Sequence, residues 1–489
     1  MHQLSLPILA MFILYVAIVF LIGIRAIFHT HNLSDYILGG RNLSGPVAGL
    51  GAGASDMSGW LLMALPGAAF VAGINEIWLP IGLATGAFLN WYFVAKRLRI
   101  YTELANNSLT VPAYLENRFN DKSKVLRSTT ALVILLFFTF YASAGFVAGA
   151  FLTQSLFHLN YLHALLITGL IIVAYTCIGG FLAVSWVDFF QGTLMFFALL
   201  IVPIITMLHV GGWHELITKL AVNGKDYFDA FHGISVIGIF SLLAWGLGYF
   251  GQPHILVRFM AAKSSKVIPL ARFICMTWMI LALYGAIFTG LTGNAYFHSL
   301  TNPETVFILL AQNLFNPWIA GILIAAVLSA IMSTVAAQML ASTSALTEDF
   351  YRAFSRKNAS HVELVIVARI SLLIIAAIAL WIASKPGGTI LQLVAYAWSG
   401  LGASFGPIII ISLYWHRMTR NSAIGGMLTG AVTVIVWEIL GKRVGSIFTL
   451  YSIIPGFLLN SIVVYGISLL GKKPPQEVRE VFAEVEKNC

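Results

Sequence analysis

Charged residues and cysteines are both scarce in this 489-residue sequence. Asp, Glu, Lys and Arg make up 10% of the chain, whereas 59% is hydrophobic and the mean hydropathy is +0.88. No soluble core absorbs so much apolar surface, so the composition predicts a protein whose solvent is the lipid bilayer. The three cysteines are too few and too scattered to predict a disulfide framework or a metal site.

Motifs for nucleotide and metal chemistry are missing as well. We find no C-x-x-C, no phosphate-binding P-loop and no G-x-S-x-G, and the histidines have no ligand spacing. These absences argue against an ATPase and a metalloenzyme, so we expect no enzymatic activity. The formal net charge of +9 is explained by basic flanks attracted to anionic lipid, without nucleic acid or a nucleotide as a partner.

Long apolar runs are what the sequence has in abundance. A membrane-spanning helix needs about 20 mostly apolar residues, and we count thirteen such stretches. The first run is too long for a signal peptide and is expected to remain as a span. The predicted spans cover residues 6–27, 45–69, 75–94, 128–151, 162–182, 189–209, 234–256, 273–295, 317–343, 364–384, 390–415, 423–439 and 450–470.

The basic residues indicate how these spans are oriented. With the N-terminus outside, all but five of the 28 Lys and Arg residues fall in cytoplasmic loops and flanks. Such an excess on the cytoplasmic side is typical of membrane proteins. We therefore predict a multi-pass protein of the plasma (inner) membrane with its N-terminus outside and its C-terminus in the cytoplasm. The basic residues left outside are Lys219, Lys225, Lys385, Lys442 and Arg443.

Two spans are interrupted by glycine. Span 45–69 contains GAGASDMSGW and span 234–256 contains AWGLGYFGQP. The two lie five spans apart and so run in opposite directions, as the inverted repeats of transporters predict. The alternative is that these glycines only reflect the general frequency of glycine in membrane helices. The predicted division is an extra first helix and loop (1–44), repeat one (45–210), repeat two (234–416), and two extra helices with a short cytoplasmic tail (417–489).

Asp56 in the first break, and the adjacent hydroxyls Ser333 and Thr334 in span 317–343, point to a cation site. A carboxylate deep in the bilayer costs about 2.5–3.5 kcal/mol, and we expect no Lys or Arg at mid-membrane depth to pair with it. Carbonyls freed by unwinding and nearby hydroxyls form an oxygen shell suited to a hard cation. The alternatives are a structural pairing for Asp56 and hydroxyls bonded back to their own helix.

Several stretches carry a resemblance to a known family. GAGASDMSGWLLMALPGA, YTCIGGFLAVSWVD, AWGLGYFGQPHIL, LFNPWIAGIL and YAWSGLGASFGP are similar to the sodium:solute symporter family. The similarity runs from DYILGGR at 35–41 to IIPGF at 453–457. It implies an all-α polytopic membrane protein with a leucine-transporter-like five-plus-five inverted repeat of about thirteen helices. It also implies import of L-proline coupled to Na⁺ by alternating access.

The same resemblance implies two sets of ligands. For Na⁺ it implies carbonyls of Ala54, Met57 and Ala330 and hydroxyls of Ser333 and Thr334, with Asp56 and Asp188 supporting the ion path. For L-proline it implies Ser58, Gly59, Trp60, Tyr141, Trp245, Tyr249 and Pro253. Taken from the residues alone, Asp188 is equally well explained as a helix N-cap. The tryptophans and Tyr249 have the alternative of simple helix packing.

Other functions remain compatible with the sequence. The nearest is Na⁺-coupled import of another amino acid, a sugar or a vitamin. A passive channel needs a continuous polar path, whereas charge inside the spans is almost confined to Asp56. A sensor built on a transporter scaffold usually has a cytoplasmic signalling domain, and the polar segment after Gly471 is short.

Overall fold

A computed structural model describes residues 6–27, 37–222, 227–356, 358–385 and 387–489. The first two residues of the DYILGGR motif, together with Lys225 and Lys357, lie outside these ranges. The described chain is helical, and its isolated β-bridge joins Leu43 to Ala262.

Helices follow one another along nearly the whole described chain. The first half of the chain forms α1 (Leu6–Ile27), η1 (Gly39–Arg41), α3 (Gly45–Asp56), η2 (Trp60–Ala64), α4 (Leu65–Ala72), η3 (Ile74–Ile77), α5 (Trp78–Leu89), η4 (Asn90–Ala95), α6 (Lys96–Leu104), α7 (Val111–Arg118), α8 (Val125–Phe157), α9 (Tyr161–Val210) and α10 (Trp213–Val222). The second half forms α11 (Val236–Leu243), η5 (Ala244–Gly251), α12 (Pro253–Ala261), η6 (Ser265–Val267), α13 (Ile268–Phe297), η7 (Pro303–Thr305), α14 (Val306–Leu314), α15 (Pro317–Ser344), η8 (Ala345–Ser355), α16 (His361–Ala383), α17 (Ile390–Tyr414), α18 (Arg420–Arg443), η9 (Ser446–Thr449), α19 (Ile453–Leu470) and α20 (Gln476–Asn488).

The predicted apolar stretches are mostly helical in the described chain. Ten helices are long and apolar enough to cross a membrane, and the bent pair of Val236–Gly251 and Pro253–Ala261 makes an eleventh. Two shorter apolar helices, Trp60–Ala72 and Tyr161–Cys177, occupy the predicted spans 45–69 and 162–182. The second is short because Gly180, with a φ of 62°, kinks α9 near the end of the predicted span 162–182.

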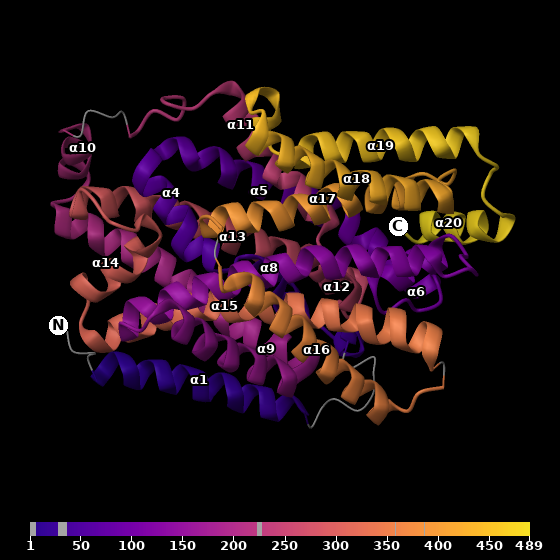
Figure 1. The fold of residues 1–489 in the computed structure, drawn as a ribbon, viewed down its shortest axis with the longest axis horizontal. Coiled ribbons are helices and arrows are strands. Elements are labelled where there is room, and N and C mark those ends of the chain that lie inside the picture. Colours follow the sequence, from indigo (N-terminus) through magenta and orange to yellow (C-terminus); the bar gives the residue numbers. More distant parts are fainter. Residues whose placement is uncertain (1–5, 28–36, 223–226, 357, 386) are drawn as a thin grey trace.

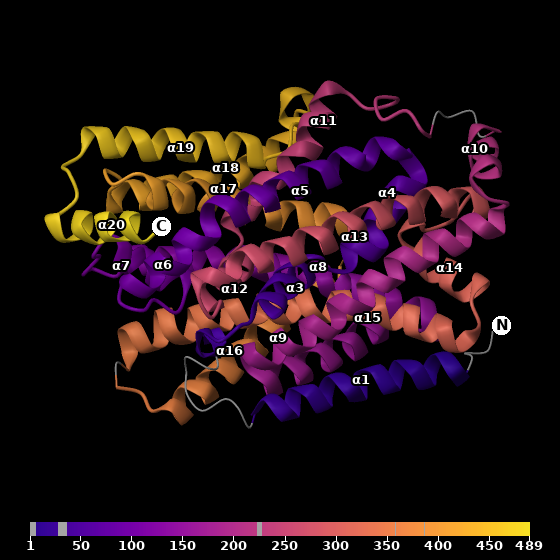
Figure 2. The same cartoon turned by 180° about the vertical axis from the view of Figure 1, so that it is seen from behind.

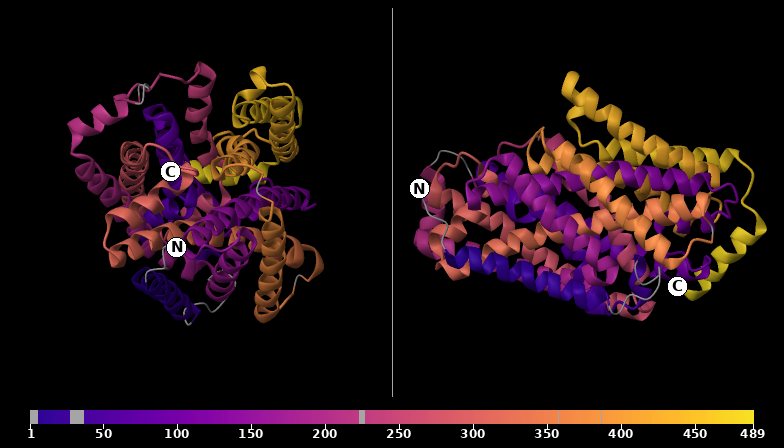
Figure 3. Two further views of the ribbon diagram at one scale, coloured as in Figure 1. Left: turned by 60° about the vertical axis from the view of Figure 1, so that its left-hand side comes forward. Right: turned by 60° about the horizontal axis from the view of Figure 1, so that its bottom comes forward.

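The most deeply buried helices form the centre of the bundle. In α15 with η8, 89% of the most apolar window is buried, against 83% in α17 and 72% in α8, but only 22% in α1. Figure 1 shows α1 along one edge, and Figure 3 shows α18 and α19 as a pair at another edge. Seen from behind in Figure 2, α3 crosses the middle, where it contacts α9, α12, α13 and α15. The central helices are therefore those that contain the predicted ligands.

The two ends of the bundle contain different elements. Figure 2 places α6, α7 and α20 at one end and α10 and α14 at the other. The first set belongs to the segments predicted on the cytoplasmic side, and the second to those predicted outside. We call the end formed by α6, α7 and α20 the basic end, because Lys96, Arg97, Arg99 and Arg118 lie there.

The C-terminal helix α20 packs against the basic end. Its Phe482 is 3% exposed, and the ring of Phe482 lies 6.4 Å from the ring of Tyr101. The guanidinium of Arg118 lies 5.2 Å from the same Phe482 ring. Glu486 pairs with Arg97 at 3.7 Å. The tail predicted from its polarity to be a short cytoplasmic segment is therefore an ordered amphipathic helix that covers the buried Arg118.

Candidate functional site

The predicted break in span 45–69 is present at the position of Asp56. Helix α3 ends at Asp56, and Met57 has φ −81° and ψ 80°, outside the helical region. The N–H of Met57 still donates to the carbonyl of Gly53 at 3.0 Å, and the N–H of Ser58 donates to the carbonyl of Asp56 at 3.0 Å. The chain then resumes as η2 from Trp60. Asp56 therefore stands at the last helical turn, beside unwound backbone.

Predicted ligands for a cation meet where α3 crosses α15. The hydroxyl of Ser333 lies 3.0 Å from the carbonyl oxygen of Ala54 and 3.1 Å from that of Ala330. The neighbouring hydroxyl of Thr334 is buried and has no hydrogen-bond partner among the described residues. Met57, the fifth member of the set, is fully buried. Three of the five predicted ligands thus contact one another directly, and two helices contribute to the cluster.

Asp56 contacts the second half of the chain rather than a Lys or Arg side chain. The hydroxyl of Tyr249 donates to Oδ2 of Asp56. Oδ1 has no hydrogen-bond partner in the described chain, and Nε2 of His254 lies 4.0 Å from it. The carboxylate is 1% exposed. One carboxylate oxygen thus remains available to a ligand, and buried polar atoms in that state require an ion, a water or a substrate group.

The predicted break in span 234–256 is also present. The 3₁₀ segment η5 follows α11, and the axis bends by 47° before α12 begins at Pro253. Proline has no N–H and fits the first turn of a new helix. Three side chains bind the backbone and so stabilise this break: Asn90 donates to the carbonyl of Tyr249 at 2.9 Å, Trp398 donates to that of Trp245 at 2.8 Å, and Gln252 donates to that of Trp398 at 3.2 Å.

Asn90, Gln252, Trp398 and His254 are residues that the sequence reasoning missed. Asn90 in FLNWYF and Gln252 in FGQP are polar side chains within apolar runs. A buried amide in such a run has to find a partner, and this signal is present in the sequence. What the sequence does not contain is the identity of that partner.

The predicted aromatic residues of the solute set form a cluster between the two breaks. The rings of Trp60 and Trp245 lie 6.4 Å apart, and Trp245 stacks on Tyr451 at 5.4 Å and on Trp398 at 6.4 Å. Tyr249 contacts the edge of Trp398 at 5.2 Å. Because Tyr249 also binds Asp56, the aromatic cluster and the oxygen cluster share a side chain.

The remaining residues of the solute set have different surroundings. The N–H of Trp60 donates to the hydroxyl of Ser58 at 3.4 Å. A Cβ at Gly59 would lie 2.8 Å from Ile331 and 3.0 Å from Ala148, so Gly59 permits close helix packing. Tyr141 is buried, and its hydroxyl is unpartnered in the described chain.

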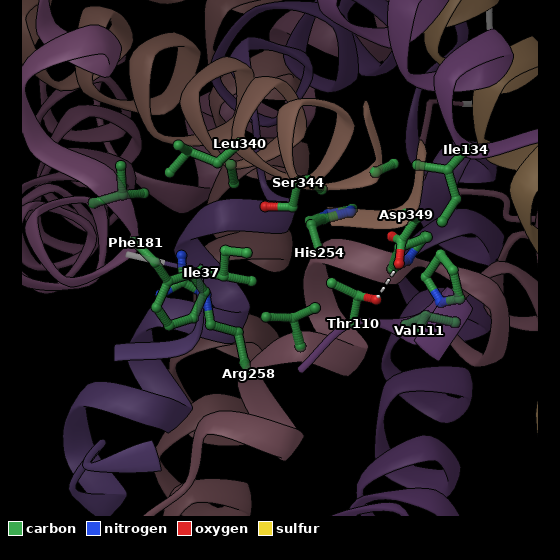
Figure 4. A pocket seen from close by; sticks show the side chains of 17 residues that line it. Ile37, Thr110, Val111, Ile134, Phe181, His254, Arg258, Leu340, Ser344 and Asp349 are labelled. Atoms are coloured by element: carbon green, nitrogen blue, oxygen red, sulfur yellow. Dashed lines mark hydrogen bonds between the residues drawn. The ribbon is translucent and has the colours of Figure 1, made fainter. Parts of the chain in front are cut away.

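The solute set is not a single cluster. Trp245 lines a surface depression between α11 and the α18–α19 connection, together with Glu438 and Tyr451. Pro253, by contrast, lines a buried cavity with His254, and Figure 4 shows that cavity. The predicted ligands therefore lie on both sides of the break, with Tyr249 and Trp60 between them.

Asp188 corrects two expectations. It lies inside α9 and is fully buried, so it is not an N-cap. Its Oδ2 accepts from the guanidinium of Arg258, which also donates to the hydroxyl of Ser185. Arg258 was placed on a cytoplasmic flank, after the predicted span 234–256, whereas it belongs to α12, the second half of the bent span, and is buried. Asp188 is neutralised by protein, whereas Asp56 is not.

The match to a known family extends over most of the chain. A model of the sodium:solute symporter family matches residues 36–430. The chain belongs to this family. Its glycine breaks, buried carboxylate and paired hydroxyls are therefore features of a symporter.

Relatives of this symporter match along nearly their whole length. A sodium/proline symporter of Salmonella typhimurium is 51% identical, over 99% of this chain and 97% of the relative. A high-affinity proline transporter, PutP, of Bacillus subtilis is 50% identical, over 95% of this chain and 98% of the relative.

Solved structures confirm the fold of the symporter. A substrate-bound, outward-open Na⁺-coupled sialic acid symporter has a TM-score of 0.79 at 19% identity, covering 97% of this chain and 100% of that one. A nucleobase-cation-symport-1 family transporter in a closed conformation has a TM-score of 0.57 at 15% identity. The predicted all-α polytopic, leucine-transporter-like fold is correct.

The arrangement in this symporter connects two kinds of ligand chemistry. Carbonyl and hydroxyl oxygens beside one free carboxylate oxygen suit a hard monovalent cation. Aromatic faces suit the apolar part and the ammonium group of a small solute. Both groups of atoms include residues from the break in α3, so that movement of this break affects the two sites together.

Proposed function

We propose that this protein imports L-proline together with Na⁺ by alternating access. The observation that carries the proposal is the oxygen cluster of Ser333, Ala54 and Ala330, together with the free carboxylate oxygen of Asp56 at the end of the same helix as Ala54. Relatives at about half identity that are named sodium/proline symporter and proline transporter support the same two ligands. Na⁺ is held by Ala54, Met57, Ala330, Ser333 and Thr334.

The proposed solute site lies next to this cluster. Trp60, Trp245 and Tyr249 enclose the pyrrolidine ring and its secondary ammonium, while free N–H groups of the broken helices receive the carboxylate. Ser58, Gly59 and Tyr141 flank this position, and Pro253 follows on the route toward the basic end. Repeat one (45–210) and repeat two (234–416) each contribute one break to the site.

Coupling follows from the shared break. Na⁺ joins α3 to α15 and orders the backbone around Asp56, which raises the affinity of the adjacent solute site. Binding linkage makes this effect reciprocal, so L-proline also raises the affinity for Na⁺. A potential of 100 mV supplies about 2.3 kcal/mol per charge, enough for roughly a 50-fold solute gradient. Import therefore uses no nucleotide, and the protein is a transporter without enzymatic activity.

The proposed orientation places the basic end in the cytoplasm. The N-terminus is then outside the plasma (inner) membrane and the C-terminus inside. This orientation is supported by the distribution of basic residues and by the position of α6, α7 and α20 at one end of the bundle in Figure 2.

Replacing Na⁺ by K⁺ tests the coupling ion. In proteoliposomes at a fixed membrane potential, initial uptake of labelled L-proline is expected to fall to the level of protein-free vesicles, because K⁺ is too large for the same oxygen cluster. Reconstituted protein assayed in Na⁺ on the same day is the control. Unchanged uptake in K⁺ would refute Na⁺ coupling.

A panel of unlabelled solutes tests the substrate. Excess L-proline is expected to compete fully with labelled L-proline, whereas a sugar, a vitamin and a larger amino acid are expected to compete weakly. The aromatic faces of Trp60, Trp245 and Tyr249 favour a compact solute with a cationic ammonium group. If another solute of the panel drives Na⁺-dependent uptake more strongly than L-proline, the protein is a symporter for that solute instead.

Trp245→Ala is expected to weaken L-proline binding more than Na⁺ binding. The change removes the ring that contacts Trp60 and Tyr451, and loss of such an aromatic contact corresponds to about 10-fold in affinity. Equilibrium binding of labelled L-proline at several Na⁺ concentrations measures both constants. Trp318→Ala, in a half-exposed tryptophan at the start of α15, is the matched control. A larger effect on Na⁺ than on L-proline would assign Trp245 to packing.

A further inference from the structure

A cavity extends from the neighbourhood of Asp56 toward the basic end, where Val111 of α7 lines it. It begins at His254, whose Nε2 lies 4.0 Å from Asp56, and it follows α15 from Ala337 through Ala341 to Asp349 in η8. Twelve residues of helix correspond to about 18 Å. Figure 4 shows His254, Ser344 and Asp349 among the side chains that line this space.

The cavity ends at a second, open depression. That depression is polar and is lined by Glu116, Arg127, Glu348 and Arg352, among other residues. Asp349 lines the cavity, whereas Arg127 lines the depression, and Nε of Arg127 lies 2.6 Å from Oδ1 of Asp349. This ion pair therefore stands between the two spaces.

Asp349 has one occupied and one free oxygen. Oδ1 accepts from Arg127 and, at 3.1 Å, from the hydroxyl of Thr110, a contact drawn in Figure 4. Oδ2 is buried and has no hydrogen-bond partner among the described residues. The side chain as a whole is fully buried. A buried carboxylate with an unused oxygen is a strong attractor for a cation.

Arg127 forms ion pairs with more than one carboxylate. It pairs with Glu116 at 2.8 Å and with Glu348 at 3.5 Å as well as with Asp349. Glu348 in turn pairs with Arg352 at 3.1 Å. The guanidinium therefore keeps two acidic partners if it leaves Asp349, so the exchange leaves no buried Arg charge unpaired.

The size of the cavity selects what passes through it in this conformation. Its volume is about 40 Å³, whereas a water needs about 10–15 Å³ on this kind of measure. One to three waters or a small cation fit, and an amino acid does not. The lining beyond Asp349, His254 and Arg258 is largely apolar, so a cation entering the cavity has few other anionic positions.

We propose that the Arg127–Asp349 ion pair is the gate at the basic end of the sodium path. Na⁺ leaving the site at Ser333 passes His254 and binds the carboxylate of Asp349 in exchange for Arg127, which swings to Glu116 and Glu348. Arg127 is thus a tethered cation that competes with Na⁺. This inference rests on the proposed function, because it takes Na⁺ as the coupling ion and the basic end as cytoplasmic.

Inhibition of uptake by internal Na⁺ tests the gate. In right-side-out membrane vesicles loaded with increasing Na⁺, initial uptake of labelled L-proline falls as Na⁺ occupies the symporter from inside. Asp349→Asn removes the receiving carboxylate, and the half-inhibiting internal Na⁺ is expected to rise at least about fivefold. Arg127→Gln removes the competing cation, and the same concentration is expected to fall about fivefold.

The opposite directions distinguish a gate from a structural ion pair. If the pair only stabilised the fold, both substitutions would break the same contact, and the two shifts would agree in sign. Glu363→Gln is the matched control, because Glu363 pairs with Arg356 at 3.6 Å and lines neither the cavity nor the open depression. It is expected to move the half-inhibiting concentration by less than about twofold. Equal shifts for Asp349→Asn and Arg127→Gln, or no shift in either, would overturn the gate.

Charge-retaining variants test the gate if Asp349→Asn and Arg127→Gln fail to insert into the membrane. Arg127→Lys keeps the positive charge but loses the planar fork that spans several carboxylates, so a smaller fall is expected. Asp349→Glu is expected to stay near the parent value, and a rise for Arg127→Lys would overturn the gate. Parent vesicles assayed in Na⁺ and in K⁺ separate the two proposals. If the parent protein shows no Na⁺-dependent uptake, the proposed function is refuted. If the parent shows Na⁺-dependent uptake but the variants do not shift as expected, only the gate is refuted.

Discussion

Asp56→Asn is expected to reduce Na⁺-dependent uptake of L-proline at least about 100-fold, equivalent to roughly 2.7 kcal/mol, while the protein still reaches the membrane. The substitution keeps the shape of the side chain and an oxygen that accepts from Tyr249. It removes only the negative charge beside Ser333, Ala54 and Ala330. Because no Lys or Arg pairs with Asp56 in the described chain, we expect a bound cation to neutralise that charge. Initial uptake rates, normalised to the amount of protein in the membrane, measure the effect.

Two variants separate the charge of Asp56 from its hydrogen bond. Tyr249→Phe deletes the donor to Asp56 and leaves the carboxylate, so we expect a partial loss of uptake. Asp229→Asn, in the connection before α11, removes an acidic side chain of the same size far from the bundle centre and is expected to change little. Full activity of Asp56→Asn, combined with loss in Tyr249→Phe, would assign Asp56 to a structural role.

Joint substitution of Ser333 and Thr334 by alanine is expected to raise the Na⁺ concentration for half-maximal uptake about 30-fold, since two hydroxyl contacts contribute about 1 kcal/mol each. Ser333 is the side chain that joins α3 to α15 at 3.0 Å. Thr334 is buried beside it with a hydroxyl that has no partner in the described chain. Uptake measured across a range of external Na⁺ at constant ionic strength gives the Na⁺ concentration for half-maximal uptake. The maximal rate of uptake is expected to change less than this concentration.

Ser329→Ala provides the comparison for this double variant. Ser329 lies one turn earlier in α15, and its hydroxyl donates back to the carbonyl of Ala325 at 2.9 Å, as hydroxyls in membrane helices commonly do. It is expected to leave the Na⁺ requirement unchanged. An unmoved requirement in the double variant would remove these two hydroxyls from the cation site and would leave the carbonyls of Ala54, Met57 and Ala330 as its proposed ligands.

The parts of the structure that could be predicted are those that one span encodes by itself. The break at Asp56 follows from glycines and a carboxylate within an apolar run, and both bear on local backbone geometry. The kink in α9 and the helix start at Pro253 likewise have local causes in Gly180 and in the ring of proline. The adjacency of Ser333 to Ala54 was implied by family resemblance, and the structure places those atoms in contact.

The parts that could not be predicted depend on contacts between distant spans. Arg258 was placed on a cytoplasmic flank, because a basic residue near the end of an apolar run usually lies there. Its pairing with Asp188 becomes visible only when α12 lies against α9. The same is true of Tyr249 with Asp56 and of Asn90 with the backbone of η5. The pattern of one sequence indicates that a buried polar atom needs a partner. Which residue is that partner depends on how the helices pack.

The pairing of Asp188 with Arg258 sets an order for biogenesis. The two residues are 70 positions apart, so at 5–20 residues per second the ribosome adds Arg258 roughly 4–14 s after Asp188. Until then, the second half of α9 contains a carboxylate without its counter-charge, and its release into lipid is opposed by about 2.5–3.5 kcal/mol. We therefore expect this helix to be retained by the insertion machinery, or shielded, until α12 arrives. The buried carboxylate of Asp188 thus links the release of α9 into lipid to the synthesis of α12.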